Sequence, residues 1–350
     1  MTDCKKLIDK LKSTNSLSAD EFVYLIENRK PETDNYLYSL SREVTDSIYG
    51  REVYIRGLIE FTNYCRRDCL YCGIRRSNKN AERYRLTKED ILECCKQGYE
   101  LGFRTFVLQG GEDGYFTDDI ICDIVRSIKE KYPDCAVTLS IGEKSGESYK
   151  KFREAGADRY LLRHETADRE HYSKLHPSSM SYEGRRECLR VLKKAGFQTG
   201  SGFMVGSPFQ TPQTLAEDMI FLKELQPHMV GIGPFIPHHD TPFGSYPAGS
   251  ADLTVFFIAL IRLMLPFALI PATTSLGTSD PMGREKGILA GANVIMPNLS
   301  PLSVRKKYML YDNKLCTGDE AAEHLKELND RICRVGCEIS AGRGDCKGDY

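Results

Sequence analysis

Three cysteines carry the clearest chemical signal in this 350-residue chain. Cys65, Cys69 and Cys72 lie in the run Cys-Arg-Arg-Asp-Cys-Leu-Tyr-Cys, directly after a β-patterned segment at residues 54–61. Four thiolates would complete the coordination of a 4Fe–4S cluster, whereas three leave one iron open to an outside molecule. The spacing therefore predicts a cluster on which chemistry can occur. A zinc site is the alternative, and it needs a fourth ligand such as His164 or a distant cysteine.

Composition restricts the classes of partner and the compartment. Lys and Arg number 48 against 49 Asp and Glu, which gives a net charge of -1 and argues against nucleic acid or anionic lipid as a partner. We expect a small, neutral or locally charged substrate instead. No apolar stretch is long enough to span a membrane, and the N-terminus lacks a secretory apolar core, so the expected location is the cytoplasm. The 13 cysteines are then expected to be reduced rather than paired in disulfides.

Apolar strand-like runs alternate with amphipathic segments along most of the chain. The runs are residues 53–61, 104–109, 136–140, 159–163, 198–205, 229–235, 269–275 and 293–296. Eight such repeats predict an α/β fold, a complete TIM-type (β/α)8 barrel. Helix candidates include Thr87 to Leu101 and Thr211 to Leu225, each with a threonine at its expected N-cap. We expect an N-terminal helical extension at 1–49, the barrel with C-terminal helices at 50–340, and a polar tail at 341–350.

Reactive residues of such barrels lie at the C-terminal ends of the strands, so polar residues there are site candidates. Gly110 and Gly111 would let a ligand approach the backbone closely. Arg163 and Glu165 end an apolar strand, where each needs a partner: either they bind a zwitterionic ligand or they pair with each other. His164 points the other way by strand alternation and is expected to be a packing residue.

The cysteine motif, with an aromatic residue before its last cysteine, resembles that of radical S-adenosylmethionine (SAM) enzymes. In these enzymes the amino and carboxylate groups of SAM fill the open iron. The resemblance implies that a Gly-Gly-Glu turn holds the methionyl amino group and that an arginine reaches the carboxylate. The implied SAM-binding residues are Tyr71, Gly110, Gly111, Glu112, Glu165, Arg185, Met204 and Ile236.

Longer strings resemble one family more closely, the E-type maturases of FeFe-hydrogenase, called HydE. These strings are residues 55–61, 65–76, 83–85, 107–109, 157–167, 229–238, 271–274 and 291–298. The resemblance implies that reductive SAM cleavage yields a 5'-deoxyadenosyl radical, which acts on an iron–carbonyl–cyanide–cysteinate precursor made by HydG. The product passes toward the di-iron centre assembled on HydF, and an outside donor supplies electrons. The implied substrate residues are Arg56, Gln109, Thr138, Ser140, Arg163, Thr273, Thr274, Met296, Tyr308 and Tyr311. From the residues alone, Thr138 and Ser140 equally suit an internal hydrogen-bonded layer of the barrel.

The C-terminal region departs from the family pattern. The family often carries an accessory cluster after a Lys-Ile/Leu-Cys element, but here no cysteine follows Cys316 until Cys333. We therefore expect no accessory cluster, and we expect Cys333 and Cys337 to share a helix, with Cys346 in the tail. Two other functions remain open. One is radical SAM chemistry on a small amino-acid or sulfur-containing metabolite, as in the more distantly similar biotin and methylornithine synthases, and the other is a non-catalytic iron–sulfur carrier.

Overall fold

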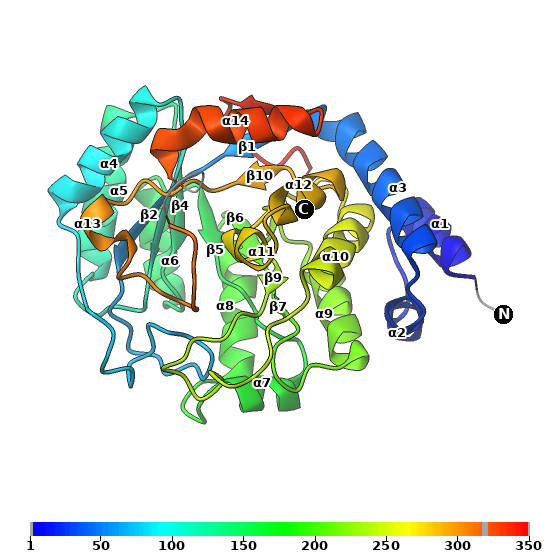
Figure 1. The fold of residues 1–350 in the computed structure, drawn as a ribbon. Coiled ribbons are helices and arrows are strands. Elements are labelled where there is room, and N and C mark those ends of the chain that lie inside the picture. Colours follow the sequence, from blue (N-terminus) through cyan, green and yellow to red (C-terminus); the bar gives the residue numbers. More distant parts are fainter. Residues whose placement is uncertain (1–2, 317–320, 349–350) are drawn as a thin grey trace.

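Parallel strands form the centre of the molecule (Figure 1). The computed structural model describes residues 3–316 and 321–348; the ends of the predicted N-terminal extension and tail, residues 1–2 and 349–350, lie outside this range. Six strands pair in the order β2-β3-β4-β5-β6-β8. They are β2 (Gly57–Thr62), β3 (Thr105–Gly110), β4 (Ala136–Ser140), β5 (Arg159–Leu161), β6 (Gln198–Ser201) and β8 (Met229–Val230). The α/β class that the sequence predicts is confirmed.

Shorter strands extend this arrangement. β1 (Glu52–Ile55) pairs in parallel with β10 (Val294–Ile295) and with β11 (Glu338–Ser340), while β7 (Met204–Val205) pairs with β9 (Gly233–Pro234). Isolated parallel bridges join Leu58 to Asn298, Met229 to Leu269 and Pro271 to Val294. β2 therefore contacts the chain just after β10, and β8 contacts Leu269, two residues before the Pro271 that bridges to β10.

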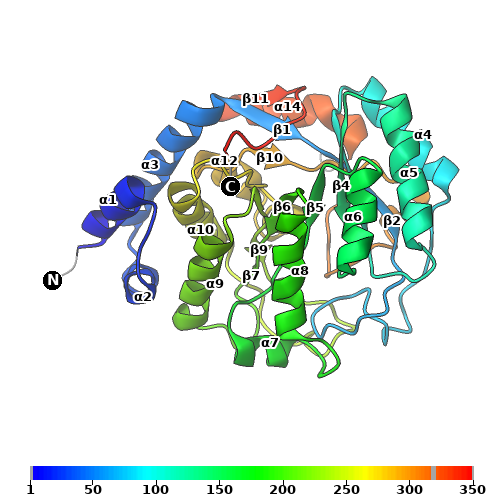
Figure 2. The same ribbon diagram turned by 180° about the vertical axis from the view of Figure 1, so that it is seen from behind.

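Helices lie outside the strands in both views (Figures 1 and 2). Those between strands are α4 (Lys88–Glu100), α5 (Asp118–Lys131), α6 (Gly146–Glu154), α7 (Arg169–Leu175), α8 (Tyr182–Lys194), α9 (Pro212–Leu225), α10 (Ala251–Met264), α11 (Thr274–Ser279) and α12 (Gly283–Leu289). α4 and α9 begin where the sequence predicts, because the Thr87 and Thr211 side chains accept hydrogen bonds from the third backbone N–H of each helix. After β10 come α13 (Leu302–Arg305), the short 3-10 helix η2 (Ala322–His324) and α14 (Leu325–Arg334).

Three helices precede the strands: α1 (Cys4–Thr14), α2 (Ala19–Glu27) and α3 (Pro31–Tyr49). They pack against α9 and α10 at one side of the molecule, where Leu11 and Phe22 are fully buried (Figure 2). Burial of each such side chain contributes about 1.5–3 kcal/mol. The predicted N-terminal helices are present. No helix in the described part of the chain combines the length and apolar character needed to cross a membrane.

Some predicted elements differ from the structure. The strand predicted at 269–275 is wrong in its second half, because α11 begins at Thr274 and only isolated bridges precede it. The runs at 198–205 and 229–235 each divide into two short strands. At this break Gly202 approaches Gly231 so closely that a Cβ on Gly202 would lie 2.0 Å from the Gly231 carbonyl oxygen.

The prediction that Cys333 and Cys337 share a helix is wrong as well. α14 ends at Arg334, and Gly336 adopts a positive φ of 72°, a conformation that terminates helices. Cys333 is exposed, whereas Cys337 is buried beyond the turn. The two thiols therefore do not lie one turn apart on a common face.

The polar tail packs across the end of the strands opposite the cysteine loop. Arg159, the first residue of β5, is fully buried and donates to the carbonyl oxygens of Arg343 (2.9 Å) and Gly344 (3.1 Å). It also forms an ion pair of 2.5 Å with Asp345. Arg56 donates to Gly344 as well, at 3.4 Å. Residues 343–345 thus supply polar partners to two arginines at the N-terminal ends of the strands.

Candidate active site

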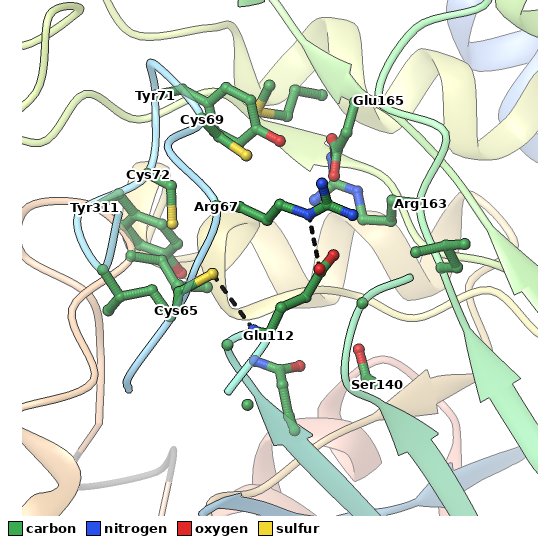
Figure 3. A pocket seen from close by; sticks show the side chains of 18 of the residues that line it. Cys65, Arg67, Cys69, Tyr71, Cys72, Glu112, Ser140, Arg163, Glu165 and Tyr311 are labelled. Carbon is green, nitrogen blue, oxygen red and sulfur yellow. Dashed lines mark hydrogen bonds and ion pairs between the residues drawn. The ribbon is translucent and has the colours of Figure 1, made fainter. Parts of the chain in front are cut away.

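The cysteine loop leaves the C-terminal end of β2 and lines a cavity of about 300 Å³. Cys65, Cys69 and Cys72 all line this cavity and are partly buried. Figure 3 shows their side chains along one side of the pocket, with Arg67, Glu112, Arg163 and Glu165 facing them. The placement agrees with the rule that reactive groups lie at the C-terminal ends of parallel strands.

The environment of the thiols suits metal ligation. Burial raises the pKa of Cys69 to about 12 and also raises the pKa values of Cys65 and Cys72, so the free thiols keep their protons at neutral pH. A bound cation would displace these protons. The backbone N–H of Glu112 donates to Cys65 Sγ at 3.3 Å. No fourth cysteine lines this pocket among the described residues, so the donor set fits a 4Fe–4S cluster with one open iron.

Arg83 holds the cysteine loop in place. Its guanidinium donates to four backbone carbonyl groups, those of Asn63 (2.5 Å), Ile74 (2.8 Å), Arg75 (2.7 Å) and Asn78 (3.1 Å). An irregular loop cannot pair its own carbonyl groups as a helix or strand does, so these bonds replace secondary structure. One side chain therefore fixes the chain on both sides of the cysteines.

Gly111 permits the close packing of β3 against this loop. A Cβ at this position would lie 2.2 Å from the carbonyl oxygen of Tyr64 and 2.7 Å from Cys65 Cβ. Distances below 3.0 Å require the neighbour to move, and the first contact is with backbone. The glycine pair predicted to approach a ligand thus also accommodates the chain at the first cysteine.

Glu112 is occupied by contacts within the protein. Its carboxylate lies 3.0 Å from Arg66 Nε and 2.6 Å from Arg67 Nε, and it accepts the backbone N–H of Glu143 at 2.9 Å. Glu143 in turn contacts Arg67 at 2.7 Å and Arg185 at 2.7 Å. Burial alone would lower the pKa of Arg185, but Glu143 raises it, so Arg185 stays charged.

This charge network contains two residues that the sequence analysis missed. Arg67 lines the pocket, and Glu143 links it to Arg185. Arg67 could have been predicted, because it is a charged residue inside the cysteine motif. Glu143 follows Ile141-Gly142 after β4, at a strand end where an acidic residue is also a candidate.

Arg163 and Glu165 face the pocket from the end of β5 (Figure 3). Arg163 Nη2 lies 3.2 Å from Glu165 Oε2, so the mutual ion pair that the sequence left open is present. Those two atoms and Arg163 Nε are nonetheless buried without a hydrogen-bond partner among the described residues. Buried polar atoms are normally paired. These groups can therefore still take up a charged, polar ligand such as SAM.

His164 points away from the pocket, as strand alternation predicts. Its Nδ1 lies 2.9 Å from Ser201 Oγ and its Nε2 lies 3.1 Å from Asp218 Oδ1. Both ring nitrogens therefore have partners. This arrangement removes His164 as the fourth ligand of a zinc site at the three cysteines.

A buried ion pair lies behind the part of the pocket that Tyr308 lines. Lys314 Nζ is 2.7 Å from Glu60 Oε1, and Asn298 Nδ2 donates to the other carboxylate oxygen at 2.9 Å. Lys314 also lies 5.3 Å from the centre of the Tyr308 ring, and Tyr308 lines the pocket. Gln109 contacts the Tyr308 hydroxyl at 3.5 Å.

The pocket brings together many of the predicted site residues. All of the predicted SAM-binding residues line it: Tyr71, Gly110, Gly111, Glu112, Glu165, Arg185, Met204 and Ile236. Half of the predicted substrate residues line it as well, namely Gln109, Ser140, Arg163, Tyr308 and Tyr311. The others lie outside its lining: Arg56, Thr138, Thr273, Thr274 and Met296.

Three of those other residues differ in whether their polar atoms are already used. Thr273 Oγ1 donates to the Ile232 carbonyl at 3.2 Å and is thus already used. Arg56 Nε and Thr138 Oγ1 are buried without a hydrogen-bond partner among the described residues. Arg56 lies just before β2, near the tail.

The chain is similar to known proteins over most of its length. The model of the radical SAM superfamily matches residues 59–222. The chain is 51% identical over 280 residues to the FeFe hydrogenase maturase subunit HydE of Thermotoga maritima, and the alignment covers 80% of each chain. It belongs to the HydE family of radical SAM enzymes.

Solved structures agree with the fold of this HydE-family protein. Methylornithine synthase (PylB) has a TM-score of 0.85 at 28% identity, with 95% of this chain and 97% of that chain covered. HydG, a maturase of the FeFe-hydrogenase, has a TM-score of 0.82 at 21% identity, with 97% and 76% covered, and this likeness concerns the fold alone. Membership of the radical SAM superfamily implies a 4Fe–4S cluster and SAM as cofactors.

Proposed function

We propose that this HydE-family enzyme acts in maturation of the FeFe-hydrogenase H-cluster, on an iron–carbonyl–cyanide–cysteinate precursor. The observation that carries the proposal is the convergence of three cysteine thiols, a charge network and the Arg163–Glu165 ion pair on one cavity. The similarity to HydE of Thermotoga maritima supports the choice of substrate class. HydG as the source of the precursor, HydF as the next acceptor and an outside electron donor complete the proposal.

The chain's own residues have separable tasks in this scheme. When bound, a 4Fe–4S cluster supplies the electron that splits SAM into methionine and a 5'-deoxyadenosyl radical. Cys65, Cys69 and Cys72 would hold the cluster. Arg163 and Glu165, whose mutual ion pair is 3.2 Å long, would exchange this contact for the charged groups of SAM. Exclusion of water by the cavity wall protects the radical from side reactions.

We assign the deeper part of the barrel to the precursor. Ser140, Tyr308 and Tyr311 line the pocket and offer hydroxyl groups. Beyond them, Thr138 Oγ1 and Arg56 Nε are buried polar atoms that still lack a partner in the described chain. Buried donors of this kind suit cyanide and carboxylate groups, because charge-assisted hydrogen bonds are strongest where water is excluded. Thr273, Thr274 and Met296 belong to the same proposed set.

We also infer that the barrel is complete. The bridges Met229–Leu269, Pro271–Val294 and Leu58–Asn298 support this inference, because they lead from β8 through the chain around β10 to β2. A closed ring of strands leaves no exposed edge and encloses the radical on all sides. A conventional small metabolite is the second candidate substrate, favoured by the TM-score of 0.85 to methylornithine synthase.

SAM cleavage by the reconstituted protein tests the proposal. Dithionite-reduced protein with its iron–sulfur cluster is incubated anaerobically with SAM, with and without the organometallic cysteinate, and deoxyadenosine is measured. We expect deoxyadenosine formation to rise with the precursor and to vanish in Cys69→Ala. Cys188→Ala is the matched control, because Cys188 is a partly buried thiol on α8 outside the pocket lining. SAM cleavage at the same rate with and without the precursor favours a small metabolite as the substrate. If no SAM is cleaved, the result favours a non-catalytic iron–sulfur carrier.

A further inference from the structure

The turn that carries Arg163 and Glu165 has an unusual backbone. Glu165 adopts a φ of 67°, in the left-handed region that residues other than glycine rarely enter. This conformation is unfavourable for an L-amino acid, because its Cβ atom comes too close to the following carbonyl oxygen. It persists only where the surrounding structure compensates, and such positions cluster at functional sites. The turn therefore needs a support, and the support lies on the side away from the pocket.

His164 is the first part of this support. It is 1% exposed and does not line the pocket. Its ring lies between Ser201 Oγ (2.9 Å) and Asp218 Oδ1 (3.1 Å), with the ring of Phe221 packed edge-on at 4.8 Å. Burial lowers the pKa of His164 to about 3, so the imidazole is neutral at physiological pH. A neutral ring has one N–H and one acceptor nitrogen, which matches one carboxylate and one hydroxyl partner.

Asp218 is the second part. It lies on α9, is fully buried, and its Oδ1 accepts hydrogen bonds from His164 Nε2 and from the backbone N–H of Ala167 at 2.6 Å. One carboxylate oxygen therefore binds the chain on both sides of Glu165. The Glu165 N–H itself donates to the Gly202 carbonyl at 3.1 Å.

Fold stability alone gives no reason for this carboxylate. Asp218 Oδ2 has no hydrogen-bond partner among the described residues, and burial raises the pKa of Asp218 well above its usual value. A buried carboxylate with one unpaired oxygen is costly, and apolar replacements of buried polar groups are often neutral or stabilising. Its contacts are concentrated on the turn whose other face carries the pocket residues.

We propose that His164 and Asp218 are positioning residues that hold the Glu165 turn in its left-handed conformation and so direct Arg163 and Glu165 toward SAM. This inference rests on the proposed function of the pocket as a SAM site. Neither residue touches the ligand, because both lie behind the strand end. The pair acts through the backbone of residues 164–167.

Asp218→Ala tests the backbone part of the proposal without any cofactor. The change removes the carboxylate, so that His164 and the Ala167 N–H both lose the oxygen they contact, whereas Asp218→Asn keeps one such oxygen and should have a smaller effect. We expect hydrogen exchange at the amides of residues 164–167 to accelerate at least tenfold in the cluster-free protein. Ser201→Ala removes only the hydroxyl partner of His164 and is expected to act in the same direction more weakly. Unchanged exchange in both variants overturns the proposal.

SAM affinity of the cluster-containing protein tests the functional part. We expect Asp218→Ala to raise the dissociation constant of SAM about tenfold. In a Glu165→Gly background the effect of Asp218→Ala should be much smaller, because glycine adopts the turn without strain and one of the two positioned side chains is gone. Equal effects in both backgrounds contradict a positioning role.

Ser41→Ala separates positioning from stability. Ser41 is fully buried on α3 and donates to the Ala290 carbonyl at 2.6 Å, far along the chain from the pocket. It should lower the free energy of unfolding and leave SAM affinity unchanged. If Ser41→Ala weakens SAM binding as much as Asp218→Ala does, general destabilisation is the cause and the proposal fails. If the unaltered protein does not bind SAM, the proposed function fails instead.

Discussion

Lys314 and Glu60 show how much a single ion pair matters once water is excluded. Their side chains are 5% and 0% exposed, whereas those of the pair Lys10–Glu21 on the N-terminal helices are 47% and 26% exposed. The contact distances are similar, at 2.7 Å and 2.6 Å. The difference between the two pairs therefore lies in solvation, not in geometry.

Lys314→Met should lower the free energy of unfolding by about 3–5 kcal/mol, because it leaves the Glu60 carboxylate buried without its counter-charge. Lys10→Met, the same substitution at an exposed pair, should cost less than about 1 kcal/mol. Urea denaturation of both variants checks this. Similar losses in the two variants would contradict the assigned role of burial.

The residue types at the strand ends predicted the lining of the pocket well. They did not predict which of these residues pair with each other. Cys65, Cys69 and Cys72 could be predicted because the signal is local. Glu143 could not be predicted as the partner of both Arg67 and Arg185, because the three come from different loops and helices that only the fold brings together. The same limit applies to Asp218, whose side chain meets His164 across 54 residues.

Among the elements, the passage from β2 into the cysteine loop depends on the neighbouring β3. The end of β3 lies against Tyr64 and Cys65 at Gly111, where a Cβ would lie 2.2 Å from a backbone oxygen. Only glycine fits this approach without moving the loop. The geometry of the first cysteine is therefore set by a residue that is not in the loop itself.

Gly111→Ala should impair cluster assembly strongly, because the added methyl group displaces the loop at Cys65. Iron and sulfide content after anaerobic reconstitution, together with visible absorbance, measures the effect. Gly114→Ala is a close control in the same segment, since a Cβ there meets nothing within 4 Å. Full cluster content in Gly111→Ala would contradict this prediction, because it would show that the loop can move and still bind the cluster.

The order of strands and helices could be predicted well from periodicity. The breaks within the predicted strands could not. β4 coincides with the predicted run at 136–140, where apolar residues and a polar end are clear. The break at Gly202 arises from close contact with Gly231, a residue between β8 and β9 that is distant in sequence. β11 was missed because its three residues become a strand only by pairing with β1.

Across the whole molecule, charge at the strand ends opposite the cysteines is balanced by the tail. Burial alone would raise the pKa of Asp345, but Arg159 and Arg343 lower it to about 2. The folded pKa lies below the ordinary value of about 3.9. The contribution of Asp345 to stability is therefore complete above about pH 4 and is lost as the pH falls toward 2.

Asp345→Asn should accordingly destabilise the protein at pH 7, and the difference from the unaltered protein should shrink between pH 4 and pH 2. Urea unfolding of the cluster-free protein at several pH values measures this difference. Lys326→Gln, on the exposed face of α14, serves as a control. Its effect on the free energy of unfolding should not change with pH in this range. A difference that stays constant to pH 2 would show that Asp345 does not act through its charge.

The position of the tail has a consequence for biosynthesis. Residues 343–345 leave the ribosome after every strand of the fold, yet they supply polar partners to Arg159 and Arg56. Until they emerge, the nascent strands surround two buried cations that lack these partners, which is costly in a low-dielectric interior. Strands that have already been translated therefore reach their final packing only after residues 343–345 have emerged. A pause in synthesis near residue 340 should prolong the need of the nascent chain for chaperones.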